Sequence, residues 1–233
     1  MPSIREEFDE LILGIDDLRP VEDNRSSSNE LKRIKEYSDE NLNLILPKIN
    51  TKNDEEKRNI AVNLIAALDY YIHEIIIWGI VQITTNKFPE GKSYDKVKIS
   101  ISHLKKSIEN SDDIFDDTEL KKTIIDEFRR NSYQKWEEIR AGLKIILPDT
   151  IQSKLSDLTS GKNGVPKFQT IDLEKISNKR HIIVHHFDRE YNNNSLRNTF
   201  NIDCKNSFDL IKLIIDSIHE IITEYDETRP EQY

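Results

Sequence analysis

Residues 176–187 read ISNKRHIIVHHF. The apolar residues recur at helical spacing, which predicts a buried helix over 171–190. On a wheel of 100° per residue, one face carries Leu173, Ile176, Ile183, Val184 and Phe187. Arg180 falls in the middle of that face, although a guanidinium stays protonated and is costly to bury alone. Arg180 is therefore expected to meet a carboxylate, a solvated cleft or an anionic ligand.

Three histidines accompany Arg180 on the same predicted helix. His181 and His185 are four residues apart and adjoin the Arg180 edge of the apolar face, whereas His186 lies on the opposite flank. Arginine binds phosphate through a fork of donors, and histidine exchanges a proton near neutral pH. Together these side chains suit phosphodiester cleavage without a metal.

Two other interpretations of this helix remain open. In the first, Arg180 is a structural anchor and the histidines are ordinary surface residues. In the second, His181 and His185 bind a metal with Asp188 nearby, because i, i+4 histidines are typical of zinc-binding helices. The H-E-x-x-H pattern of such helices is incomplete here, since Ile182 stands in place of the glutamate.

The rest of the chain predicts an all-α protein. Only 6 Gly and 7 Pro interrupt its 233 residues, and no segment has a competing strand pattern. We expect Ser28 and Ser207 to cap two of the helices. Residues 1–52 are polar and predict a helical extension laid over a core domain at 53–233. The predicted helices span 4–18, 28–48, 54–86, 93–110, 115–131, 132–147, 171–190 and 207–226.

The composition of the chain limits the classes of function that it can have. The net charge of -9 weighs against non-specific binding to duplex nucleic acid, yet it allows a nuclease with a small basic pocket. Cys204 is the single cysteine, which excludes an internal disulfide and a cysteine-cluster metal site. The acidic N-terminal segment differs from a signal peptide, and the apolar run at 75–83 is too short to span a bilayer. We expect a cytoplasmic protein without membrane contact.

Two motifs resemble a known family. RHIIVH at 180–185 has the form R-x4-H with a polar residue directly after the arginine, and NLIAALDYYIHEII at 63–76 precedes it. Both resemble HEPN domains, in particular the RiboL-PSP-HEPN branch, over roughly residues 54–226. The resemblance implies a HEPN-type helical bundle that forms a homodimer and cleaves RNA without a metal or other cofactor.

The resemblance also implies roles for three residues in a composite site at the dimer interface. Arg180 would hold the scissile phosphate, His185 would act as general acid or base, and His181 would orient the phosphate or His185. Attack by the ribose 2′-hydroxyl would leave a 2′,3′-cyclic phosphate and a 5′-hydroxyl. The expected partners are RNA, a second copy, and an antitoxin or other protein of a phage-defence system.

Two alternatives to a ribonuclease remain at this point. One is a non-catalytic HEPN module that binds RNA, a nucleotide or a partner protein, and the other is a helical scaffold or antitoxin-like subunit. The family's toxins controlled by nucleotide modification carry a tyrosine where this chain has Phe187. Control by modification at this position is therefore not expected, although Tyr191 lies one turn further on.

Asp69 and His73 are the predicted supporting residues, together with His186. They are four residues apart in the most apolar predicted helix, where a charged aspartate needs a partner. Asp69 could fix the side-chain conformation of Arg180 or tune a catalytic histidine. The alternative is a simple Asp69–His73 pair on the helix surface.

Overall fold

The computed structural model describes residues 27–98, 117–128, 130–161, 167–189 and 202–228. This part of the chain contains seven α-helices, two short 3-10 turns and no strand, which confirms the all-α prediction. The α-helices are α2 (Ser27–Ile45), α3 (Asp54–Thr84), α5 (Asp117–Phe128), α6 (Trp136–Ile146), α7 (Asp149–Ser160), α8 (Thr170–His186) and α9 (Cys204–Thr228). The 3-10 turns are η1 (Leu46–Lys48) and η2 (Tyr94–Lys96).

Helix α3 is the centre of the bundle. It contacts α2, α5, α6, α8 and α9, and its residues are buried on nearly every side from Ile60 to Ile83. Asn53 caps it by accepting a hydrogen bond from the Glu55 N–H at 2.8 Å. By length and composition α3 could also span a bilayer, but 72% of its most apolar window is buried by other helices. The apolar residues of α3 therefore pack into the core of the helical bundle.

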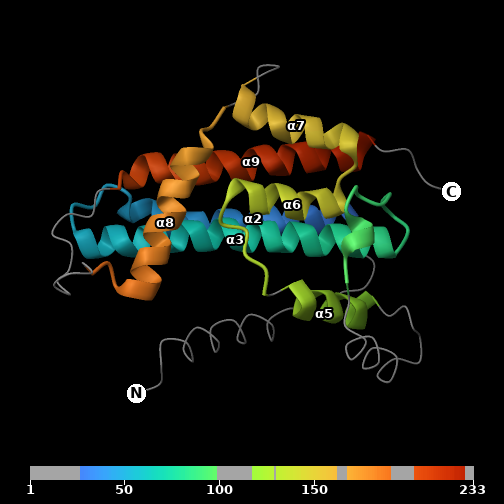
Figure 1. Ribbon diagram of the computed structural model, residues 1–233, viewed down its shortest axis with the longest axis horizontal. Helices are drawn as coiled ribbons and strands as arrows, with labels where there is room; N and C mark the ends of the chain where they lie inside the picture. Colours follow the sequence, from blue (N-terminus) through green and yellow to red (C-terminus); the bar gives the residue numbers. More distant parts are fainter. Residues whose placement is uncertain (1–26, 99–116, 129, 162–166, 190–201, 229–233) are drawn as a thin grey trace.

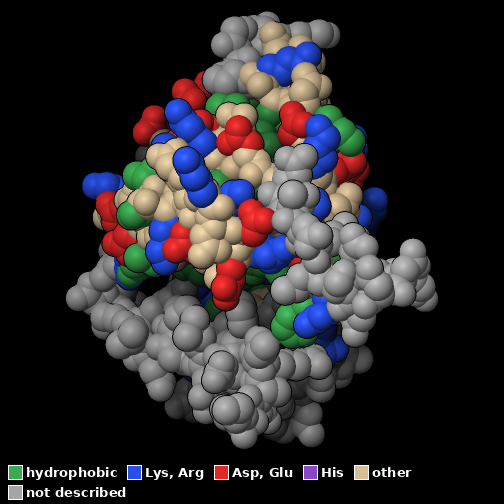
Figure 2. Space-filling view, turned by 90° about the vertical axis from the view of Figure 1, so that its left-hand side faces the viewer, with side chains coloured by type: hydrophobic (Ala, Val, Ile, Leu, Met, Phe, Trp, Pro, Cys, Tyr) green, Lys and Arg blue, Asp and Glu red, His purple; other side chains and the backbone are tan. Residues whose placement is uncertain are grey.

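The outer surface carries charges of both signs. On the face shown in Figure 2, Lys and Arg side chains alternate with Asp and Glu side chains, and small apolar patches lie between them. The described part of this face has no broad basic area. A surface of this kind does not favour non-specific binding of a long nucleic acid.

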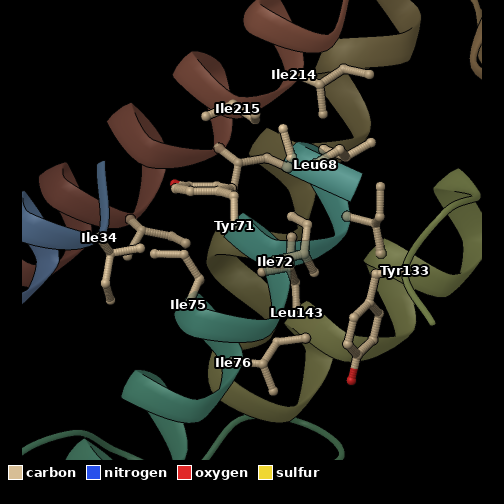
Figure 3. Packing of buried hydrophobic residues seen from close by; sticks show 14 of the residues in the cluster. Ile34, Leu68, Tyr71, Ile72, Ile75, Ile76, Tyr133, Leu143, Ile214 and Ile215 are labelled. Carbon is tan, nitrogen blue, oxygen red and sulfur yellow. The ribbon is translucent and has the colours of Figure 1, made fainter. Parts of the chain in front are cut away.

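The core is one continuous cluster around α3. Leu68, Tyr71 and Ile72 are completely buried, and Figure 3 shows Tyr71 on the side of α3 that faces Ile215 of α9. Tyr133, just before α6, packs on the other side. Burial of one such large side chain stabilises the fold by about 1.5–3 kcal/mol. The cluster also includes residues of α2, namely Leu31, Ile34, Leu42 and Ile45.

A polar contact fastens α2 to α9. The Nζ atom of Lys35 lies 2.6 Å from Asp39 Oδ1 and 2.9 Å from Asp216 Oδ1. His219 lies on α9 near this contact. Burial is the main cause that lowers the pKa of the His219 ring to about 4, and the positive charge of Lys35 on α2 is the second. Helix α2, which the sequence assigns to an extension, is thus joined to the same core by both apolar and charged contacts.

Helices α3 and α6 approach each other closely at two glycines. A Cβ at Gly79 of α3 would lie 2.6 Å from Ile146 Cβ of α6, and a Cβ at Gly142 of α6 would overlap Ile76 Cδ1 of α3. Any larger residue at either position would push the two helices apart. The short separation holds Tyr133 against α3, next to Asp69.

Several helix predictions are corrected. Helix α7 is absent from the prediction, although Ile151, Leu155 and Leu158 follow helical spacing after Pro148. Helix α9 begins at Cys204 rather than 207, and Asp203 accepts the Asn206 N–H at 2.9 Å in place of the expected cap. Within the predicted helix at 93–110, only the η2 turn is helical and residues 97–98 are not. Residues 99–110 and the predicted helix at 4–18 lie outside the described residues.

Candidate functional site

Helix α8 crosses α3 steeply, and only its first half is buried. Figure 1 shows the C-terminal end of α8 projecting beyond α3. Leu173 and Ile176 are buried, whereas Val184 is 44% exposed and Phe187 is 63% exposed. The expectation that the whole apolar face is buried is therefore wrong. The crossing angle carries the second half of α8 away from the core, which leaves two large apolar side chains in contact with solvent.

A left-handed turn ends α8. Phe187 has φ of 52° and donates its N–H to Ile183 O at 2.9 Å, and Asp188 also has φ of 52°. Side chains larger than glycine adopt this conformation at a cost. Asp188 is completely buried, and its Oδ2 accepts a hydrogen bond from Arg58 Nε at 2.9 Å. This buried ion pair holds the end of α8 against α3.

Arg180 lies where α8 leaves the core. Its side chain is half-buried, and its Nε atom is fully enclosed without a hydrogen-bond partner. Among the described residues, the Arg180 guanidinium forms no ion pair within 4 Å. A permanently charged group that is half-buried and lacks a carboxylate is a candidate anion-binding residue.

The three histidines lie on the exposed half of α8. The ring centroids of His181 and His185 are 4.5 Å apart, and those of His181 and His186 are 6.3 Å apart. All three side chains are exposed. The predicted pairing of His181 with His185 on one side of the helix is present, and His186, expected on the opposite flank, faces the His181 ring edge-on.

Asp69 and His73 contact each other on α3, with His73 Nδ1 3.8 Å from Asp69 Oδ1. Asp69 Oδ1 accepts the backbone N–H of Tyr133 at 2.5 Å, and His73 Nδ1 donates to the Asp69 carbonyl at 2.9 Å. The His73 ring also packs edge-on against Tyr133, with centroids 4.7 Å apart. Asp69 thus joins α3 to the segment before α6, and no ion pair connects it to Arg180 within the described chain.

The positive charge of Arg180 nevertheless affects the pKa of the Asp69 carboxyl. Burial raises the pKa of the Asp69 carboxyl, against the lowering effects of the Tyr133 N–H and of the His73 and Arg180 side chains. The Glu138 carboxylate adds a smaller upward shift. Asp69, His73, Glu138 and Arg180 therefore share one electrostatic environment, although Arg180 is not held by a direct carboxylate contact.

The residues considered for a metal do not come together. Asp188 faces Arg58 in the interior, while His181 and His185 face solvent. Over the residues that the structure describes, no three His, Cys, Asp or Glu side chains form a group that could hold a metal ion. Tyr191 lies outside these residues.

Comparisons with known proteins add no assignment. No family model, curated protein or solved structure matches this chain. The site is therefore interpreted from its own chemistry.

Sequence reasoning missed the Arg58–Asp188 pair and the role of Tyr133. Their partners are separated by 130 and 64 residues, respectively, so no local spacing connects them. The one available signal was Asp188 itself, a charged residue directly after Phe187 at the end of the predicted apolar face.

Proposed function

We propose that this chain is a metal-independent endoribonuclease whose active site forms where the α8 helices of two copies meet. Each copy would supply Arg180, His181 and His185. The exposed half of α8 is the surface that carries these groups, and the RNA phosphate is the ligand that they suit.

The observation that carries this proposal is the state of Arg180. Its guanidinium is half-buried and has no ion pair in the described part of the chain, and two accessible imidazoles lie along the same helix. A structural anchor would be expected to meet a carboxylate, because an unpaired buried charge is strongly destabilising. A phosphate would supply that missing negative charge.

The chemistry follows from Arg180 and from the His185 side chains of the two copies. Arg180 would bind the non-bridging oxygens of the scissile phosphate and stabilise their charge in the transition state. One His185 would take the proton of the ribose 2′-hydroxyl as its oxygen attacks phosphorus. The His185 of the second copy would donate a proton to the leaving 5′-oxygen. The products are a 2′,3′-cyclic phosphate and a 5′-hydroxyl, and DNA would not be cleaved.

The exposed apolar residues support a second copy as the partner of α8. Arg180 and Val184 are spaced i, i+4, and Phe187 follows at the end of the helix. Val184 and Phe187 present apolar surface directly beside the polar site residues. A two-fold interface would bury these side chains and bring two His185 rings to one cleft.

The biological setting is proposed from the resemblance to HEPN domains. A ribonuclease of this type would act in the cytoplasm as a toxin or phage-defence effector, and an antitoxin or other partner would restrain it. Phe187 has no hydroxyl, so restraint would not involve nucleotide transfer to this position. A module that binds RNA without cleaving it is the alternative outcome of the test below.

RNA cleavage in the presence of EDTA tests the proposal. Wild-type protein is expected to cut transfer or total RNA, and Arg180→Ala and His185→Ala are each expected to abolish cutting. Lys175→Ala is the matched control for Arg180, since Lys175 is exposed on the same helix and, among the described residues, pairs with Asp172 alone, at 2.8 Å. Binding of RNA without cleavage would replace the enzyme by a binding module. Cleavage by both variants would remove α8 from the site.

A further inference from the structure

A hollow of about 300 Å³ opens beside His181. It lies between the segment leading into α6 and the middle of α8. Its walls include Gln134, Lys135, Glu138, Ser177, Asn178 and His181. A volume of this size is at the lower end of the range for small-molecule sites.

Glu138 forms a rigid wall of this pocket. Its Oε2 atom accepts the backbone N–H groups of Gln134 and Lys135, each at 3.1 Å. The bond to the Lys135 N–H is the Glu138 half of a capping box at the start of α6. The other carboxylate oxygen has no hydrogen bond within the described residues. The second oxygen of the Glu138 carboxylate is therefore held in place and can accept a hydrogen bond from a ligand.

Further polar groups lining the pocket are also without partners. Ser177 is only 4% exposed, and its hydroxyl forms no hydrogen bond in the part of the chain that the structure describes. The Asn178 side chain, the next residue along α8, is likewise without a bond there. A nearly buried hydroxyl that opens into a cavity is typical of a site that binds a polar ligand.

The pocket adjoins the proposed phosphate site. His181 belongs to both, and Arg180 directly precedes it on α8. The Glu138 charge also acts on Asp69, as the Arg180 charge does. A nucleotide whose phosphate contacts Arg180 could therefore place its base in the pocket.

We propose that this pocket binds the guanine base of the RNA nucleotide held at Arg180, an inference that rests on the proposed ribonuclease function. The Watson–Crick edge of guanine presents two adjacent donors, N1–H and N2–H, which can both donate to the free oxygen of the fixed Glu138 carboxylate. The Lys135 ammonium group can donate to guanine O6 or N7. Adenine, cytosine and uracil do not offer two neighbouring donor groups beside an acceptor in this arrangement.

Binding of the four nucleoside monophosphates to the full chain tests this inference independently of cleavage. Wild-type protein is expected to bind GMP about tenfold more tightly than AMP, CMP or UMP, since hydrogen bonds to a base edge discriminate at about this level. Glu138→Gln keeps the capping box but replaces one acceptor oxygen with a donor group. It is expected to bind all four with similar affinity, whereas Glu137→Gln, at the neighbouring exposed residue, keeps the preference.

The remaining outcomes separate this inference from the proposed function. Equal affinity of the wild type for the four nucleotides, or no saturable binding of GMP, overturns the guanine site. RNA cleavage without preference for guanine would leave the ribonuclease intact and overturn the pocket assignment. GMP selectivity that depends on Glu138, in a protein that never cleaves RNA, would retain the guanine site and overturn the ribonuclease.

Discussion

The Asp188 carboxylate, just past the end of α8, accepts a hydrogen bond from Arg58 Nε, near the start of α3, at 2.9 Å. Asp188 is completely buried, and the Arg58 side chain is 15% exposed. The pair determines how α8 ends, and thus how its exposed histidines are presented. Asp188→Ala is expected to lower the free energy of unfolding by about 3 kcal/mol, because it removes one partner of a buried ion pair.

Urea unfolding followed by circular dichroism measures this loss. The exposed Lys175–Asp172 pair on α8 is the control, and Lys175→Ala is expected to change stability by less than about 1 kcal/mol. Equal effects of the two substitutions would mean that the Arg58–Asp188 contact does not anchor α8.

Phe187 occupies a backbone conformation that favours glycine. Phe187→Gly is expected to raise the free energy of unfolding of the monomer by about 1 kcal/mol, because φ is 52° and the side chain is 63% exposed. Val184→Gly should have the opposite effect, since glycine within a helix is unfavourable. In sedimentation equilibrium, Phe187→Gly is expected to weaken self-association. An unchanged dimer would exclude Phe187 from the interface.

Asp69 supports the site through Tyr133. Asp69→Ala is expected to destabilise the protein by about 1–3 kcal/mol, because the Tyr133 N–H would lose its acceptor. Asp69→Asn retains an acceptor oxygen and is expected to lose less. Thermal unfolding measures the loss of stability in each variant, and the RNA cleavage assay measures the loss of activity. An Asp69→Ala protein with unchanged stability and cleavage would remove Asp69 from the site.

His219 makes stability depend on pH. Its pKa is about 4 in the folded chain, below the ordinary value of 6.5, because burial disfavours the charged ring. The unfolded chain therefore binds more protons between these two values. The contribution of His219 to stability is fully present above pH 6.5 and is progressively lost as the pH falls towards 4.

His219→Gln is expected to flatten this part of the stability curve, as measured by urea unfolding at several pH values between 4.5 and 7. Equal slopes for the wild type and His219→Gln would show that other groups cause the acid sensitivity.

The sequence predicts the helices more completely than it predicts their contacts. The sequence predicts α3 and α8 close to their observed bounds, at 54–86 and 171–190. The sequence does not predict that α8 crosses α3 and leaves Val184 and Phe187 exposed. A helical wheel shows which residues share a face, but not the angle at which two helices pack. Likewise, the wheel places Arg180 among apolar residues, but only the tertiary structure separates it from Asp69 and assigns the Asp69 carboxylate to Tyr133.

Identification of the RNA ends tests the central claim most directly. Products of the wild-type protein, generated in EDTA, are expected to carry 2′,3′-cyclic phosphate and 5′-hydroxyl ends. A substrate with a single 2′-deoxyribose at the cleavage position should resist cutting. RNA with 2′,3′-cyclic phosphate or 5′-hydroxyl ends should not form with His185→Ala, whereas Lys175→Ala should give the same products as the wild type. Ends with a 5′-phosphate and 3′-hydroxyl, or cutting of the deoxy-substituted RNA, would contradict attack by the 2′-hydroxyl at this site.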